Sequence, residues 1–452
     1  MKKKILILTI LALCAVAGAT ALGDLAAGMN AGEWRTFATT NVGPTIAGFS
    51  GGATGCIFPY ACGGVWDPAS LSFYFVGSDH QHSTGYPKFI KYSAASNAWS
   101  VMSQPSWFPS LTANAMHGYD GNAIDAQHGV LYFARYCCNS TFYKYTISTS
   151  TWTQLPDCGS LQYSYQNCGG LEYFPELGGL VFCSGMPTAG SGAVYFFNTT
   201  TNAWSKIASG LAIGDYHNFA EYNPVHHVVV LGGGNSNSAI YKLDAQKNIT
   251  RLTDAPAAVS SLRVNYNIFT ADPVTGDYLV YGGEGGSGAS YKYNVVTDTW
   301  TNLNHVAPFM ETAPNANGGA VFLSVGSQIS SYGVNMFVKY TGGGGAVYVY
   351  KHSSGSAVEG SAINVEAKPG LKLSPNPFRG GAMIRMDGAL PGSHAVLRVL
   401  SPDGRIVRTE NVTATALSHG VNFAGSGLSC GIYIFSLDFG RETYQTGALL
   451  MR

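Results

Sequence analysis

Histidine, tyrosine and arginine recur at matching positions along the chain, and these side chains can move protons and hold anions. His217 and Tyr266 form the candidate base and acid, and Arg135 is the candidate clamp for a carboxylate. A neutral His or Tyr within hydrogen-bond reach can remove the proton next to a uronate carboxylate while an arginine neutralises that carboxylate. We therefore predict these three residues as catalytic if the protein is an enzyme.

The same positions supply further side chains that could hold a ligand. They belong to the segments before the first strand, or after the second strand, of a repeated unit: His80, His82, His117, Tyr119, Tyr136, Tyr216 and Glu284. A structural interpretation stays open, because tyrosine rings also cap channels and buried histidines are usually hydrogen-bonded structural residues. No Cys-x-x-Cys pattern indicates a zinc site, and we predict no metal ligands.

A unit of about 50 residues positions these side chains. Its clearest part is a Tyr-x-Tyr-like strand, a short polar turn and a strand that begins with Trp. Four copies end at Trp99, Trp152, Trp204 and Trp300, and a weaker copy reaches Ile249, where the Trp is lost. Runs of β-branched and aromatic residues with a period of two, bounded by turn residues, indicate antiparallel strands.

Five units run from about residue 60 to 304, and a sixth, less regular unit follows. The sixth lacks its last strand, and residues 33–37 supply a candidate strand from the N-terminus. Strands from both ends would close a ring without exposed sheet edges. We predict an all-β propeller with six blades, with seven as the alternative, over residues 22–351.

The glycine pairs, such as Gly232-Gly233 and Gly282-Gly283, and the Tyr–Trp motifs resemble the kelch family and, more loosely, the central domain of galactose oxidase. The resemblance covers roughly residues 33–351 and implies a kelch-like propeller. In such a fold the segments that lead into the inner strands and those after the second strands open on one face. That face is the expected ligand site.

A second domain is expected at the C-terminus. Residues 352–370 are small and polar and indicate a linker, and residues 371–452 alternate apolar and polar residues around an Asp-Gly turn. Ser374-Pro375-Asn376-Pro377-Phe378 and the late Gly431-Ile432-Tyr433 resemble the C-terminal sorting domain of type IX secretion. That resemblance implies an immunoglobulin-like sandwich whose partner is the secretion machinery.

The N-terminus has the pattern of a secretory signal peptide. Lys2 to Lys4 precede an apolar core, Ile5 to Val16, and Ala19-Thr20-Ala21 offers small residues for a peptidase. We predict a signal peptide over residues 1–21, no transmembrane segment in the mature chain, and a secreted or cell-surface protein. Export makes disulfides plausible, with Cys56–Cys62 and Cys158–Cys168 as local candidates.

Charge excludes one class of partner. Only 11% of residues are charged and the formal net charge is zero. Nucleic acid binding requires a basic surface that neutralises phosphates, so we predict no nucleic acid partner.

Four functions remain from the sequence. The first is binding of a ligand, expected to be a glycan, at the mouth of the channel. The second is a polysaccharide lyase, because several propeller lyases use His, Tyr and Arg as proposed above. The third is a copper-radical oxidase, since Tyr216-His217 resembles a copper-ligating segment of galactose oxidase and Cys62 or Cys168 could crosslink a tyrosine. The fourth is a protein-interaction module, and no cofactor is identified.

Overall fold

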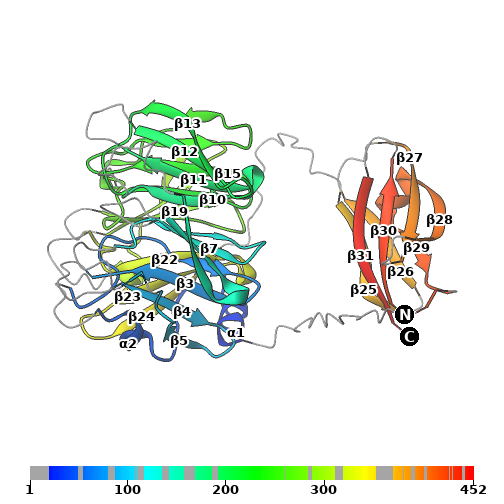
Figure 1. Ribbon diagram of the computed structural model, residues 1–452, viewed down its shortest axis with the longest axis horizontal. Coiled ribbons are helices and arrows are strands. Elements are labelled where there is room, and N and C mark those ends of the chain that lie inside the picture. The colour runs from blue at the N-terminus through cyan, green and yellow to red at the C-terminus, as the bar shows by residue number, and fades with distance from the viewer. Residues whose placement is uncertain are drawn as a thin grey trace, which may run out of the picture. The chain divides into compact units, whose positions relative to one another are not determined.

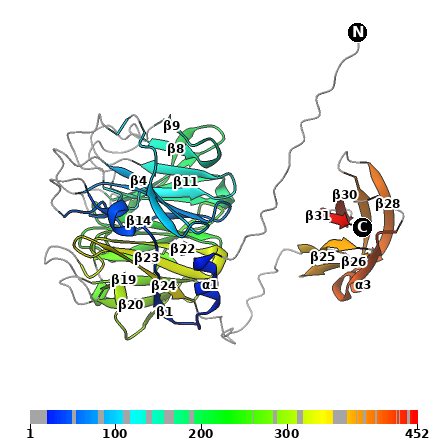
Figure 2. The ribbon, with the colours of Figure 1, turned by 90° about the horizontal axis from the view of Figure 1, so that it is seen from below.

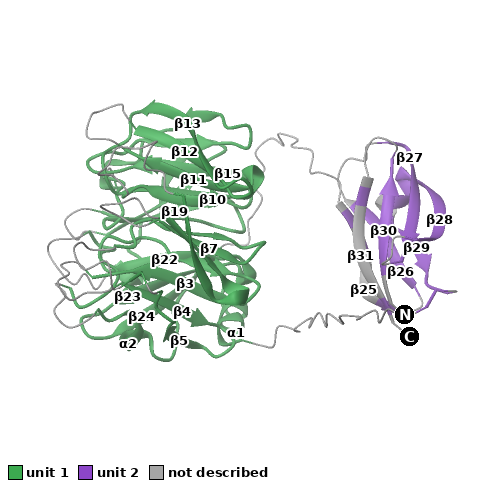
Figure 3. Ribbon diagram, in the orientation of Figure 1, with its two compact units in different colours: residues 1–356 green, residues 357–452 purple. Residues whose placement is uncertain are grey.

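The chain folds into two compact units, residues 1–356 and 357–452, in a computed structural model (Figure 3). The structure describes residues 20–48, 54–79, 87–105, 107–108, 117–134, 142–156, 168–185, 192–259, 261–283, 288–310, 319–352, 370–379, 381–387, 392–401, 405–426, 428–429, 431–439 and 443–451. Over these ranges, no helix combines the length and apolarity that crossing a membrane requires.

The first unit consists of six four-stranded antiparallel sheets (Figures 1 and 2). The first three are β2 (Val65–Asp67), β3 (Ser72–Gly77), β4 (Lys88–Ser93) and β5 (Ala98–Val101); β6 (Asn122–Asp125), β7 (Val130–Ala134), β8 (Phe142–Thr146) and β9 (Thr151–Leu155); and β10 (Gly170–Phe174), β11 (Gly179–Ser184), β12 (Gly192–Asn198) and β13 (Ala203–Leu211).

The other three sheets follow in chain order. They are β14 (Asn218–Asn223), β15 (Val228–Gly233), β16 (Ile240–Leu243) and β17 (Ile249–Arg251); β18 (Asn267–Ala271), β19 (Asp277–Gly282), β20 (Ala289–Asn294) and β21 (Thr299–Asn302); and β22 (Ser324–Ile329), β23 (Val334–Tyr340), β24 (Gly345–Lys351) and β1 (Trp34–Thr36). Short helices are α1 (Ala21–Ala27), α2 (Val42–Ile46), η2 (Ile147–Thr149), η3 (Pro175–Leu177), η4 (Ala257–Val259), η6 (Pro308–Met310) and η7 (Ser330–Tyr332).

The inner strands close a ring. β2 contacts β6, β6 contacts β10, and the order continues through β14, β18 and β22 back to β2. Each sheet is therefore one blade of a six-bladed β-propeller, as the sequence predicted. The second strands β3, β11, β15 and β19 are buried at every residue, because they are packed between neighbouring blades.

The N-terminal strand closes the sixth blade. In β1, Trp34 lies opposite Tyr350 and Thr36 opposite Tyr348 of β24. The Trp34 ring packs among Tyr281, Phe309, Phe337 and Tyr350, with centroid distances of 4.9 to 5.9 Å. This arrangement confirms the prediction that residues 33–37 supply the missing strand.

The repeated Tyr–Trp motif is a set of equivalent cross-strand pairs between third and fourth strands. Tyr92 lies opposite Trp99, and the pair recurs at the same place in three further blades as Tyr145–Trp152, Phe197–Trp204 and Tyr293–Trp300. Ring centroids in these pairs are 4.7 to 5.2 Å apart. In the fourth blade Leu243 and Ile249 take the two positions. The motif thus joins the outer edge of each of these blades.

The second unit is a β-sandwich with its own core. Its strands are β25 (Gly370–Arg379), β26 (Gly381–Asp387), β27 (His394–Leu400), β28 (Ile406–Thr413), β29 (Val421–Ala424), β30 (Gly431–Asp438) and β31 (Thr443–Met451), with helix α3 (Ala414–His419). The strands form two groups, in the orders β28-β27-β30-β31 and β25-β26-β29. A short parallel pairing of β25 with β31 joins the two groups. Phe378, Phe423 and Phe435 pack edge to face inside.

One cysteine prediction is wrong. Cys56 and Cys62 are separate buried thiols and form no disulfide with each other. The Cys62 thiol donates instead to Asp120 Oδ1 at 3.2 Å, and Cys56 Sγ accepts from the backbone N–H of Phe58 at 3.3 Å. Cys158 lies outside the described residues, so the structure does not test its pairing with Cys168.

Candidate functional site

The segments that lead into the inner strands meet around the axis of the propeller. Their backbones pair across blade boundaries: the N–H of Cys62 donates to the carbonyl of Tyr119 at 3.2 Å, and the N–H of Val264 donates to the carbonyl of His217 at 3.1 Å. Because these bonds join neighbouring blades, side chains that are far apart in sequence gather at one mouth of the channel.

Eight side chains form what we name the mouth cluster: Tyr60, His117, Tyr119, Tyr216, His217, Asn235, Arg263 and Tyr266. The Tyr60 ring lies 4.8 Å from that of His117 and stacks on His217 at 5.4 Å with an interplanar angle of 14°. The Tyr119 ring lies 5.6 Å from that of His217. His117 and Tyr119 are buried, whereas Tyr60 and His217 are partly exposed. The Tyr216 ring lies 6.3 Å from that of His217. The structure therefore brings together five residues that the sequence selected: His117, Tyr119, Tyr216, His217 and Tyr266.

The backbone of the mouth cluster adopts unusual conformations. Tyr60, Tyr119, Tyr216 and His217 have φ angles of 54°, 41°, 49° and 58°, and Asn265 has a φ of 77°. This left-handed region is unfavourable for bulky residues that carry a Cβ atom. Such residues persist only where surrounding contacts fix them, and they concentrate at binding and catalytic sites.

His217 is held as a neutral base. Its Nδ1 lies 2.7 Å from Asn235 Oδ1, and that oxygen also accepts from Arg263 Nη1 at 3.3 Å. An amide oxygen only accepts, so His217 Nδ1 carries the proton and Nε2 keeps its lone pair. Burial, together with the Arg263 cation, lowers the pKa of His217 to about 4 although the bond to Asn235 opposes that shift. The imidazole is therefore uncharged at neutral pH and can accept a proton at Nε2.

Tyr266 is coupled to His217 through Arg263. The guanidinium carbon of Arg263 lies 3.5 Å from the centroid of the Tyr266 ring, a close cation–π contact. Arg263 then bonds Asn235, which bonds His217. The predicted pair, His217 and Tyr266, thus belongs to one chain of contacts, joined by two residues that the sequence analysis did not select.

Five predicted site residues lie outside the described residues. They are His80, His82, Arg135, Tyr136 and Glu284. The structure therefore leaves open whether the predicted clamp, Arg135, faces His217.

Three residues of the mouth cluster were missed by sequence reasoning. Tyr60 lies two positions before Cys62 in a leading segment, so the same alignment could have found it. Arg263 precedes Tyr266 by three residues and is likewise within a leading segment. Asn235 follows the second strand of its blade, as the selected Glu284 does in the next blade, and the β14–β15 hairpin places it beside His217, so the same alignment could have found it.

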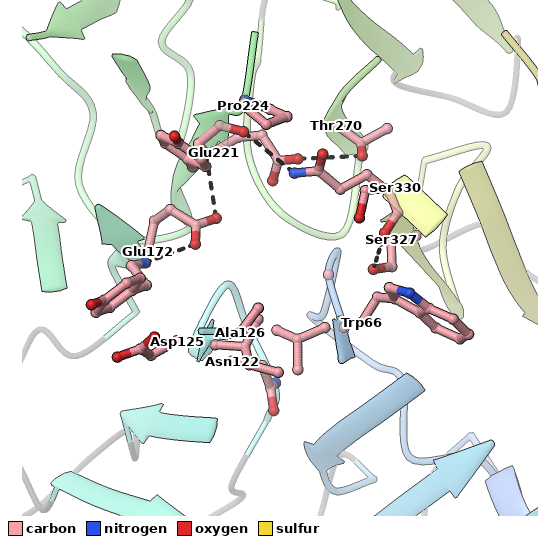
Figure 4. A pocket seen from close by; sticks show the side chains of 18 of the residues that line it. Trp66, Asn122, Asp125, Ala126, Glu172, Glu221, Pro224, Thr270, Ser327 and Ser330 are labelled. Carbon is pink, nitrogen blue, oxygen red and sulfur yellow. Dashed lines mark hydrogen bonds between the residues drawn. The ribbon is translucent and has the colours of Figure 1, made fainter. Parts of the chain in front are cut away.

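A cavity of about 240 Å³ occupies the other end of the channel (Figure 4). It is lined by the far ends of the inner strands and the turns that follow them, including Trp66, Asp125, Tyr222 and Ser330. We name it the channel cavity. None of its lining residues was selected from the sequence.

Two glutamates line the channel cavity, on the side opposite Trp66 (Figure 4). Glu172 accepts from the N–H of Tyr173 at 2.7 Å and of Tyr222 at 3.4 Å, and Glu221 accepts from the N–H of Ala271 at 2.9 Å. Burial, together with repulsion from neighbouring carboxylates, raises the pKa of Glu172 well above its usual range and that of Glu221 to about 8. Each Glu bonds the inner strand of the next blade, so both join blades.

A repeat could have revealed this pair. Glu172-Tyr173-Phe174-Pro175 and Glu221-Tyr222-Asn223-Pro224 place a carboxylate at the same position in consecutive inner strands. An acidic residue within an otherwise apolar strand pattern is unusual, because burying a carboxylate is unfavourable unless it is hydrogen-bonded.

Asp120 lies between the two ends of the channel. It directly follows Tyr119 of the mouth cluster and also lines the channel cavity. Its Oδ2 accepts from the N–H of Ala220, two blades away, at 2.7 Å, and its Oδ1 accepts from the Cys62 thiol. Burial raises the pKa of Asp120 to about 7.

The copper-oxidase alternative requires a set of metal ligands. Among the side chains that the structure describes, no three from His, Cys, Asp and Glu come together in a group able to hold a metal ion. Cys62, one of the two candidates for a tyrosine crosslink, donates to Asp120 instead.

Comparison with known proteins identifies no family. No family model matches the chain, and no curated protein matches it. Solved structures resemble it at low identity. A chain of a nidogen–laminin complex has a TM-score of 0.40 and 8% identity, with 56% of this chain and 82% of that chain covered.

Two further solved structures are a component of a secretion system and a lyase. PorZ, a surface component of the type IX secretion system of Porphyromonas gingivalis, has a TM-score of 0.37 and 12% identity, covering 89% of this chain and 60% of PorZ. An oligogalacturonate lyase in complex with manganese has a TM-score of 0.40 and 15% identity, covering 64% and 76%. With TM-scores below 0.5, these similarities carry no argument about activity.

Proposed function

We propose that this protein is an exported propeller that binds a glycan at the mouth cluster. The observation that carries the proposal is the set of partly exposed rings, Tyr60, Tyr216 and Tyr266, around the imidazole of His217 and the guanidinium of Arg263. Aromatic faces stack against the apolar faces of sugars, and a few fixed polar groups orient the hydroxyls.

Binding tests use purified mature protein and a panel of neutral and uronate-containing glycans. Tyr266→Ala removes a ring, and His217→Asn removes the imidazole while tolerating a positive φ. Each should weaken glycan binding at least tenfold by calorimetry. His128→Ala, at an exposed histidine in a distant turn, is the matched control and should bind as the parent does. No binding to any glycan would favour the protein-interaction alternative.

A polysaccharide lyase at the same cluster is the second candidate, favoured by the neutral tautomer of His217. Nε2 would take the proton next to a uronate carboxylate, the electron pair would form the ring double bond, and the glycosidic C–O bond would break with a proton going to the leaving oxygen. Arg263 would offset the carboxylate charge in the role predicted for Arg135, and Tyr266 would serve as the acid.

Product absorbance separates the two candidates. Unsaturated uronate released by the parent protein and lost in His217→Asn, with binding retained, would establish the lyase. Arg263→Gln should then slow turnover of uronate substrates more than it weakens binding of neutral glycans. Glycan binding without unsaturated product, for every glycan tested, would support the binding function and contradict the lyase.

We also propose that the propeller is of kelch type and that the second unit is the export module. Equivalent pairs in four blades, Tyr–Trp in three of them and Phe197–Trp204 in the other, support the first statement. The Ser-Pro-Asn-Pro-Phe segment of β25, next to the terminal strand β31, supports the second. Residues 357–452 fused to a reporter should direct it to the surface or medium of a bacterium with type IX secretion, and retention in the periplasm would contradict this role.

A further inference from the structure

The channel cavity is open to solvent on the face opposite the mouth cluster. Four of its lining residues, Pro68, Gln127, Pro175 and Ser330, are exposed and form part of its rim. Its volume of about 240 Å³ lies below the range of about 300–1,000 Å³ that is typical of pockets for drug-sized ligands. A molecule that enters it must therefore be small or present a single side chain.

The lining of the channel cavity is acidic. Asp120, Asp125, Glu172 and Glu221 contribute carboxyl groups, and none of the described lining residues is Lys, Arg or His. Asp125 Oδ2 pairs with Nδ1 of the exposed His128 at 2.7 Å. Within the described ranges, the other three carboxyl groups pair with no basic side chain and accept only from neutral donors. The cavity therefore lacks positive charge.

Glu221 presents an unpaired oxygen at this cavity. Its Oε1 accepts from the N–H of Ala271 at 2.9 Å and from the hydroxyl of Thr270 at 3.3 Å. Among the described residues, no group bonds Oε2, although polar atoms enclosed in a protein usually have a partner. The carboxyl is surrounded by the propeller, yet part of its surface faces the cavity. A ligand in the cavity can therefore reach Glu221 Oε2.

The second glutamate helps to define which cation suits the cavity. Glu172 Oε1 accepts from the N–H of Tyr173 at 2.7 Å, and its Oε2 accepts from the N–H of Tyr222 at 3.4 Å. A guanidinium binds a carboxylate best through two parallel bonds to both oxygens, and neither glutamate offers two unpaired oxygens. An ammonium group acts as a point charge and needs one oxygen for each bond. The pattern of acceptors therefore favours an ammonium group.

The wall opposite the glutamates is apolar. Trp66 lies on that side of the cavity in Figure 4, and its indole N–H already donates to Ser331 Oγ at 3.0 Å. Val65, the preceding residue of β2, also lines the cavity. Such a wall buries an alkyl chain and, through the indole ring, attracts a cation. A short alkyl chain that ends in an ammonium group therefore matches both walls.

We propose that the channel cavity binds a primary alkylammonium ion, with its alkyl chain against Trp66 and its ammonium group donating to Glu221 Oε2. Two sources share this chemistry: a free alkylamine and the side chain of a lysine on another protein. The site lies at the opposite end of the channel from the mouth cluster, so the proposal does not rest on glycan binding.

Binding of the ammonium group releases a proton. Burial raises the pKa of Glu221 to about 8, so most of its carboxyl is protonated at pH 7 in the free protein. The titratable groups that face it are Asp120, Glu172, Cys62 and Tyr278, and none of these is basic. The positive charge of the ligand favours the carboxylate, so the proton leaves Glu221 for solvent while the amine keeps its own.

Calorimetry with the purified mature protein provides the test, with butylamine as the ligand and butanol as its neutral counterpart. Butylamine should bind at pH 7 and release about one proton, which is counted by repeating the titration in buffers of different ionisation enthalpy. Its affinity should be about tenfold lower at pH 6, because Glu221 must then lose a more firmly held proton. Absence of butylamine binding, or equal affinity for butanol, would overturn the proposal.

A variant assigns the binding to Glu221. Glu221→Gln keeps an acceptor for Ala271 but cannot become charged, so it should weaken butylamine binding on the order of tenfold or more and abolish the proton release. Asp254→Asn, at an exposed carboxylate elsewhere, is the matched control and should bind as the parent does. Unchanged binding in Glu221→Gln would refute the assignment. The proton count and the pH dependence use the parent protein, so they decide the question even if Glu221→Gln does not fold.

A tripeptide distinguishes the two sources. Gly-Lys-Gly with blocked ends carries the same ammonium group and alkyl chain on a peptide backbone. Peptide binding with an affinity comparable to that of butylamine would support the proposal and identify a lysine side chain as the ligand. Binding of butylamine alone would support it and identify a free amine.

Discussion

His217 illustrates how single residues of the mouth cluster are prepared for chemistry. Tyr60 covers one side of its ring by stacking, and Asn235 fixes the proton on Nδ1. The nearby Arg263 raises the cost of a second proton, because like charges repel in a poorly hydrated site. A histidine in these surroundings is a base at neutral pH and not a cation.

Titration of His217 tests this state. We expect its imidazole resonances in NMR to stay unchanged from pH 8 down to about pH 5, because burial lowers the pKa to about 4. Arg263→Gln should raise that pKa, since it removes a positive charge, whereas Lys206→Gln, remote and exposed, should not. Titration near pH 6.5 in the parent protein would contradict the buried, neutral imidazole.

Glu221 makes stability depend on pH. Its pKa is raised to about 8, against about 4 in the unfolded chain, so the folded state binds the proton more tightly. The resulting stabilisation is complete below about pH 4 and is lost as the pH rises through 8. Glu221→Gln keeps an acceptor for Ala271 and carries no charge, so its stability should fall less between pH 5 and pH 9.

Urea unfolding at several pH values measures this effect. The parent should lose on the order of 1–3 kcal/mol more than Glu221→Gln over that pH range. Asp254→Asn, at an exposed carboxylate that pairs with Arg251, is the control and should follow the parent. Parallel pH profiles for the parent and Glu221→Gln would show that Glu221 is ionised in the folded state.

Among the elements, β1 completes the sixth blade of the ring. It is only three residues long, yet it supplies the outer strand of the sixth blade from the opposite end of the chain. A blade without that strand would expose the free edge of β24. Trp34 anchors β1 by packing among rings of the fifth and sixth blades.

Truncation of the Trp34 side chain should therefore weaken the attachment of β1 to the sixth blade. Trp34→Ala should lower the free energy of unfolding by about 2–4 kcal/mol, because it leaves a void between four aromatic rings. Thr36→Ala, at an exposed position of the same strand, should change it by less than about 0.5 kcal/mol. Urea denaturation compares the two, and equal effects would mean that β1 pairing alone closes the blade.

For the whole molecule, we expect the two units to unfold independently, because each encloses its own core. The propeller core contains Trp34 and its ring partners, and the sandwich core contains Phe378, Phe423 and Phe435.

Scanning calorimetry should resolve two transitions. Trp34→Ala should lower only the transition of the propeller, and Phe435→Ala, which truncates a fully buried ring, should lower only that of the sandwich. A single transition that both variants shift would contradict independent units.

Several features followed from sequence because they repeat or are local. The Tyr–Trp pairs were visible because each copy occupies adjacent strands of one blade. Their spacing predicted five units, and the irregular sixth unit, which lacked its last strand, predicted the displaced strand β1. Leading segments were aligned the same way, which selected His117, Tyr119, Tyr216 and His217. The wrong pairing of Cys56 with Cys62 came from treating closeness in sequence as closeness in space.

Tertiary structure decided what depends on contacts between blades. Arg263 reaches Asn235 and His217 only because neighbouring blades share the mouth of the channel, and no local pattern encodes that meeting, whereas Asn235 meets His217 within one blade through the β14–β15 hairpin. Asp120 bonds Ala220 across two blades, and burial there raises its pKa. Sequence by itself therefore determined the repeated architecture, because each blade is a local unit, whereas protonation states and site geometry required the closed ring.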